Sequence, residues 1–172
     1  STRRQRQMCI RDSYESDHEQ KLRELFDQMM EDPGSQLYGL LTPASKAKSK
    51  ISRVTFNSAI KPLLPMFEGR DEDEIYTAIN NYLCAFASGL GSIGCAEQMT
   101  NTTVFKASAA FFPIVASRVK DRFGSTYSAD NFLAVMDPAF ADVSPTRLKK
   151  PGSSFNDLAD YLESKLRLGF VL

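Results

Sequence analysis

The sequence predicts a mainly α-helical protein, with about six amphipathic helices packed as an irregular helical domain. Apolar residues recur at helical spacing in six segments, with polar residues between them. Good N-terminal capping residues precede several of these segments, and prolines or glycines follow them. Hydrophobic residues make up 42% of the chain and charged residues 24%, so we expect a folded chain rather than a disordered one.

The first three predicted helices lie in the N-terminal half. Residues 19–31 have an apolar face and are followed by Asp-Pro-Gly, which ends the helix. A second helix begins after Ser52, a residue favoured at the N-cap, and Pro62 ends or kinks it. Residues 72–88 form a third amphipathic helix, followed by a glycine-rich connection that we expect to be flexible.

The fourth predicted helix covers residues 103–123 and has a largely apolar face with Phe111 at its centre. Pro113 lies inside this helix and removes one backbone donor, yet the apolar face continues past it. We therefore expect a kink rather than a break. Gly124 suits the C-terminal cap.

Two further helices complete the prediction. Ser128 begins one of them, and the dipeptide Asp137-Pro138 ends it. A basic loop, residues 144–152, separates it from a last amphipathic helix that begins at Ser154. No segment approaches the roughly 20 apolar residues needed to cross a bilayer, so we expect no membrane partner.

The start of the chain has an unusual sequence. Residues 3–13, RRQRQMCIRDS, resemble one reading frame of the adapter used in transposase-based DNA sequencing libraries. This resemblance implies that residues 1–13 are adapter-derived and disordered, and that the natural sequence begins near Tyr14, inside a longer protein. The alternative is a natural basic arm. Without this segment, 21 Lys+Arg against 21 Asp+Glu becomes 17 against 20, because four arginines and one aspartate are removed.

Catalytic and metal-binding patterns are not apparent. His18 is the only histidine, and it lies in a polar helix start. The acidic run at 71–74 could bind a hard cation, although a solvated helix start is the preferred interpretation. Cys84 and Cys95 lack zinc-site spacing, and we interpret them as reduced, mostly buried thiols rather than a disulfide. We therefore expect no cofactor and no metal, and leave open whether the whole protein is an enzyme.

Three basic clusters are candidates for contact with nucleic-acid phosphates. Their members are Lys46, Lys48, Lys50 and Arg53; Arg118, Lys120 and Arg122; and Arg147, Lys149 and Lys150. The first and third clusters supply the candidate nucleic-acid-binding residues, since alternating lysines in a loop can reach successive phosphates. Binding requires that such clusters lie on one face, and the alternative is solvated surface charge.

Four segments resemble the C-terminal part of DGQHR-domain proteins, which include the DndB-type proteins of DNA phosphorothioation systems. They are DPGSQLYGLL (32–41), KISRVTFNSAIKPLL (50–64), INNYL (79–83) and TNTTVFKASAAFFP (100–113). The DGQHR motif itself lies upstream in that family, in a ParB-like nuclease-fold portion, and is absent here. The resemblance implies that this chain is a fragment of a larger α/β protein. Residues 14–70 would be a remnant of its core domain and connection, and residues 71–172 a C-terminal helical domain.

Two functions follow from these observations. The resemblance implies a non-catalytic region of a bacterial or phage-linked, cytoplasmic protein that takes part in DNA modification, defence or its regulation, with DNA or other protein subunits as partners. The alternative is a helical protein-interaction module without nucleic-acid binding, which the slightly acidic charge balance and the amphipathic helices favour.

Overall fold

The computed structural model describes residues 2–44 and 49–168, with side chains described for 17–44 and 49–166. In chain order, its elements are α1 (Thr2–Glu31), β1 (Leu41–Thr42), β2 (Ile51–Ser52), α2 (Arg53–Ile60), the 3₁₀ helix η1 (Lys61–Phe67), α3 (Glu72–Ser92), the 3₁₀ helix η2 (Ala96–Thr100), α4 (Thr102–Phe123), α5 (Ala129–Asp142), α6 (Pro145–Lys149) and α7 (Phe155–Leu168). The predicted mainly α class is confirmed.

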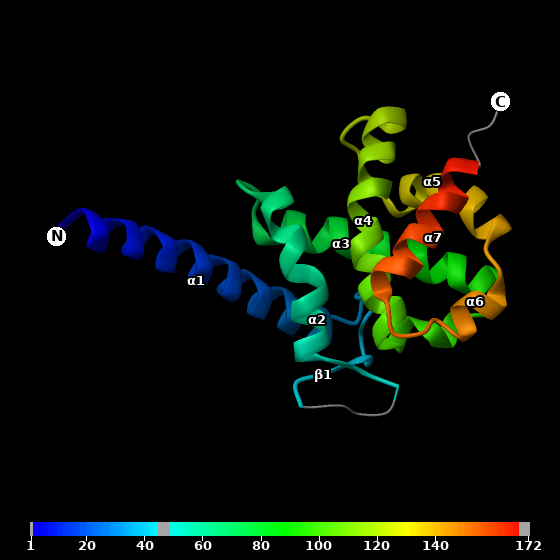
Figure 1. Cartoon of the computed structure of the whole chain (residues 1–172), viewed down its shortest axis with the longest axis horizontal. Coiled ribbons are helices and arrows are strands. Elements are labelled where there is room, and N and C mark those ends of the chain that lie inside the picture. The colour runs from blue at the N-terminus through cyan, green and yellow to red at the C-terminus, as the bar shows by residue number, and fades with distance from the viewer. Residues whose placement is uncertain (1, 45–48, 169–172) are drawn as a thin grey trace.

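Helices α3, α4, α5 and α7 pack against one another to form the body of the molecule (Figure 1). Helix α4 contacts α2, α5 and α7, and it buries most of its apolar face, including Phe111. The helix continues through Pro113 as predicted, and Gly124 caps it with a φ of 72°. The position of α4 at the centre explains why its apolar face is so wide.

The N-terminal elements share this core. The ring of Phe26 on α1 packs edge-on against Phe56 on α2, with centroids 5.3 Å apart, and Phe56 stacks on Phe105 of α4 at 6.2 Å. All three side chains are fully buried. Side chains on both sides of residue 70 therefore build one continuous hydrophobic core.

Helix α1 begins at Thr2, well before the predicted start at residue 19. The backbone of residues 2–13 is thus helical, whereas the sequence interpretation expected disorder. Adding residues to an existing helix gains one hydrogen bond for each residue fixed, and arginine and glutamine are good helix formers. In Figure 1 the N-terminal half of α1 extends away from the body of the molecule.

Three boundaries differ from the predictions. Helix α3 continues through Gly89 to Ser92, although a flexible connection was expected there. Helix α5 continues through Pro138 to Asp142, because the turn after the proline buries Ala139 and Phe140. Helix α6 lies within the predicted loop 144–152, where Leu148 is fully buried. Tertiary packing overrides the local breaker signal in each case.

Strands β1 and β2 have two residues each. They pair in parallel, with Leu41 opposite Ile51 and Thr42 opposite Ser52. Both Leu41 and Ile51 are buried, so the pair fixes the start of α2 on the core. Ser52 caps α2 as predicted, because its side chain accepts a hydrogen bond from the Thr55 amide.

Candidate functional site

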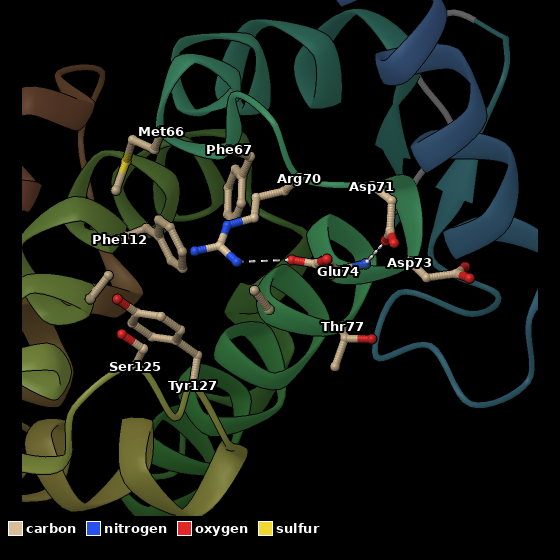
Figure 2. Close-up of a pocket in the computed structure, with 12 residues that line it drawn as sticks. Met66, Phe67, Arg70, Asp71, Asp73, Glu74, Thr77, Phe112, Ser125 and Tyr127 are labelled. Atoms are coloured by element: carbon tan, nitrogen blue, oxygen red, sulfur yellow. Dashed lines mark hydrogen bonds and ion pairs between the residues drawn. The ribbon is translucent and has the colours of Figure 1, made fainter.

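A pocket of about 490 Å³ lies between η1, the start of α3, α4 and the loop before α5. Its volume falls in the range of ordinary ligand sites. The residues that line it are Met66, Phe67, Arg70, Asp71, Asp73, Glu74, Thr77, Ala78, Phe112, Ala116, Ser125 and Tyr127. Figure 2 shows these side chains around the cavity.

The floor of the pocket is aromatic and rigid. Phe67 stacks on Phe112 with ring centroids 5.9 Å apart and an interplanar angle of 29°. The Tyr82 ring packs edge-on against Phe112, with ring centroids 4.9 Å apart. The Tyr82 hydroxyl in turn donates a hydrogen bond to the carbonyl of Ser108 at 2.6 Å. The floor therefore belongs to the packed core and keeps its shape without a ligand.

The wall formed by the loop before α5 is also fixed. Tyr127 stacks on Phe132 at 6.1 Å, and its carbonyl accepts a hydrogen bond from the Asn81 side chain at 3.1 Å. Ser128 caps α5 by accepting from the amide of Asn131. These contacts position Tyr127 opposite the start of α3.

The rim of the pocket is acidic. The lining includes the carboxylates of Asp71, Asp73 and Glu74 from the start of α3 and one guanidinium, that of Arg70. Nη1 of Arg70 lies 3.2 Å from Oε2 of Glu74, and Oδ1 of Asp71 accepts a hydrogen bond from the Glu74 amide at 2.8 Å. An apolar floor beneath an acidic rim favours a ligand that is both apolar and cationic.

A second acidic contact joins α1 to α3 near the pocket. Oε2 of Glu24 is buried, and the carboxyl group of Glu72 is its titrating neighbour. The hydrogen bond from Glu72 lowers the pKa of Glu24, and the same contact raises the pKa of Glu72. These opposite shifts are those expected when two neighbouring carboxyl groups bind one proton between them.

The first basic cluster is only partly available for a ligand. Lys46 and Lys48 lie outside the described residues, and Lys50 is exposed just before β2. Arg53, by contrast, makes an ion pair with Asp27 at 3.2 Å and lies 4.1 Å from the centroid of the Phe26 ring. Arg53 thus joins α2 to α1, a structural role that the sequence did not predict.

The other two clusters lie elsewhere on the molecule. Arg147 donates a hydrogen bond to the Pro151 carbonyl at 3.1 Å and lies 5.6 Å from the Tyr161 ring, while Lys149 and Lys150 are exposed. The second cluster lies at the C-terminal end of α4. Figure 1 shows this end of α4 and helix α6 in separate regions.

The thiols are free, as predicted: Cys84 is half-buried and Cys95 is buried. Burial raises the pKa of both thiols, which makes them weaker nucleophiles. Within the part of the chain that the structure describes, no group of three or more histidine, cysteine, aspartate or glutamate side chains is placed to hold a metal ion. The pocket is therefore the main candidate for function.

Sequence reasoning missed the pocket, although a signal was present. Met66 and Phe67 follow Pro65 and precede the acidic run, so two large apolar residues adjoin several charges. The structure shows that η1 directs them over α4.

Comparisons of the chain with protein families, with curated proteins and with solved structures found no match. The resemblance to DGQHR-domain proteins therefore stays a prediction. Among the described residues, no helix combines the length and the apolar character needed to span a bilayer.

Proposed function

We propose that this chain is a non-catalytic helical binding module that docks an apolar side chain from a helical segment of a partner protein in the pocket. One observation carries this proposal: the cavity over the Phe67–Phe112 pair is lined on one side by Met66, a large apolar side chain that is 49% exposed. Large apolar side chains at an open cavity of this size are typical of sites that receive a hydrophobic anchor.

The experiment uses a short amphipathic peptide of leucine and lysine as the partner segment. The protein is labelled with ¹³C at the methionine methyl groups, and the Met66 signal is assigned by comparison with Met66→Leu. Docking in the pocket shifts the Met66 signal in a saturable manner. Thr77 is exposed and lines the pocket, so Thr77→Trp fills the cavity and abolishes the shift.

Thr146→Trp is the matched control, because Thr146 is equally exposed but lies on α6, outside the pocket. It leaves the shift unchanged. Peptide binding that never affects Met66, or that survives Thr77→Trp, contradicts the proposal.

A second candidate is the nucleic-acid role implied by the DGQHR resemblance. The pairing of β1 with β2 supports it, because the pairing brings together the two ends of the segment that carries the alternating lysines. Salt-dependent binding of duplex DNA is the test of this candidate.

A further inference from the structure

Arg70 lines the pocket and lies just before α3. It follows Gly69, whose φ of 81° turns the chain from η1 into α3. Figure 2 shows its side chain directed into the pocket, with an ion pair to Glu74. The guanidinium thus neutralises one of the three rim carboxylates.

We propose that the pocket selects a cationic amphipathic segment, and that Arg70 is a built-in competitor which the ligand's lysine or arginine displaces from Glu74. This inference rests on the proposed docking function and names the chemistry of the partner. An apolar anchor would lie on Phe67 and Phe112, and the neighbouring cation would take the position of the Arg70 guanidinium.

The charge of the rim supports this choice of ligand. Three carboxylates and one guanidinium line the pocket, so their formal charges sum to two negative charges. Asp71 already accepts from the Glu74 amide, which satisfies part of the positive end of α3. A glutamate or phosphate on the ligand would meet like charges there, and a lysine or arginine would meet opposite ones.

The displacement of Arg70 costs little. The side chains of Arg70 and Glu74 are 62% and 51% exposed, and exposed ion pairs of this kind are weak. A second hollow of about 370 Å³ lies next to the pocket and is lined by Lys21, Arg70, Asp71, Glu72 and Asp73. Because Arg70 lines both cavities, its guanidinium can turn from Glu74 towards these other carboxylates.

The test measures the affinity of the leucine–lysine peptide by fluorescence anisotropy, with the Met66 methyl signal as the check on location. Arg70→Gln keeps most of the side-chain length and removes the competing charge, so it strengthens binding about two- to fivefold. Glu74→Gln removes the carboxylate for which both cations compete and weakens binding by a similar factor. Arg70→Lys restores the affinity of the parent protein.

Two controls make the result specific. Asp137→Asn removes one exposed carboxylate on α5, away from the pocket, and leaves the affinity unchanged. A matched peptide with glutamate in place of lysine binds the parent protein more weakly than the lysine peptide does. Added salt weakens the lysine peptide more in the parent than in Glu74→Gln.

The outcomes separate the two proposals. If the lysine peptide shifts Met66 but Arg70→Gln weakens binding or leaves it unchanged, Arg70 is not a competitor and this inference fails, while the docking function stands. The inference also fails if the glutamate peptide binds more tightly. If neither peptide affects Met66, the docking function itself fails.

Discussion

The ring of Phe140 on α5 lies directly against Gly89 of α3. A Cβ added at residue 89 would lie 2.4 Å from two carbons of that ring, closer than real Cβ atoms approach. Phe140 also packs edge-on against Phe86, with centroids 5.4 Å apart. The absence of a side chain at Gly89 therefore sets how closely α3 and α5 can approach.

We predict that Gly89→Ala lowers the free energy of unfolding by about 1–3 kcal/mol, as overpacked core sites do. The matched control is Gly91→Ala in the same helix, where an added Cβ has no neighbour within 4 Å. That substitution should raise stability by up to about 1 kcal/mol, because alanine is the better helix former. Chemical denaturation measures both, and equal effects at the two positions would contradict the packing argument.

The turn after α1 is held by side chains from α3. The Tyr76 hydroxyl donates a 2.5 Å hydrogen bond to Oδ2 of Asp32, while Oδ1 of Asp32 accepts from the Gly34 amide. Asn80 accepts from the Gln36 amide at 2.8 Å. Burial and the bond to Asp32 raise the pKa of Tyr76 to about 12, and the bond from Tyr76 lowers the pKa of Asp32.

Tyr76→Phe should lower the thermal midpoint by about 2–4 °C at neutral pH, since one hydrogen bond to a carboxylate is lost. The sign at alkaline pH follows from the raised pKa of Tyr76. Its contribution is fully present below the ordinary tyrosine pKa of about 10 and is lost as the pH rises through about 12. The difference in thermal midpoint between the parent and Tyr76→Phe should therefore shrink as the pH rises over that interval. A difference that stays constant would show that the Tyr76 hydroxyl does not titrate in this way.

Much of the fold could be predicted because the strongest signals are local. The caps Ser52 and Ser128 begin α2 and α5 as expected, and Gly124 ends α4. The boundaries at Gly89 and Pro138 could not be predicted, since each depends on a partner distant in sequence. Residue 89 is a glycine within α3 because the Phe140 ring occupies the space of a side chain there, and α5 continues past Pro138 because Phe140 gains burial.

The candidate site was harder to predict than the fold. A run of lysines or arginines in the sequence shows positive charge, but it does not show the direction of each side chain. In the structure, Arg53 and Arg147 contact neighbouring aromatic rings and polar groups. The pocket joins Met66, Phe112 and Tyr127 from three separate segments. No spacing rule in the sequence brings such residues together.

The carboxyl pair Glu24–Glu72 predicts a pH dependence of stability. Glu72 has a raised pKa, so its contribution is present below the ordinary glutamate pKa and is lost as the pH rises through the raised value. Glu24 has a lowered pKa, so its contribution is lost as the pH falls through that lower value. The pair is most favourable between these two pKa values. Its charged neighbours are Lys21, Arg23 and Asp73.

We predict that Glu72→Gln removes the decline in stability between mildly acidic and neutral pH, because the glutamine amide is a neutral donor next to Glu24 and does not titrate. Asp130→Asn is the matched control, since Asp130 is also an exposed carboxylate in the first turn of a helix. Thermal unfolding across this pH range checks both variants. If Glu72→Gln keeps the decline of the parent, the two carboxyl groups do not share a proton.

The last prediction concerns the lysine loop between β1 and β2. Because Arg53 pairs with Asp27 and covers the Phe26 ring, its removal would disturb the joint between α1 and α2. The informative variant therefore changes Lys46, Lys48 and Lys50 to alanine and keeps Arg53. If the loop contacts a nucleic-acid backbone, this variant binds duplex DNA more weakly, and its affinity depends less steeply on salt.

Filter binding at two salt concentrations decides the question. Each phosphate contact that is lost reduces the slope of log affinity against log salt by about 0.9, so the loss of three contacts is readily measured. Changing Lys149 and Lys150 to alanine is the control for general positive charge, since both are exposed on the separate surface around α6. A loss confined to the loop variant supports a defined contact, because nonspecific attraction would weaken in both variants. If the loop variant and the parent bind DNA with the same affinity and the same salt dependence, these lysines are solvated surface charge. The same conclusion follows if the parent does not bind DNA.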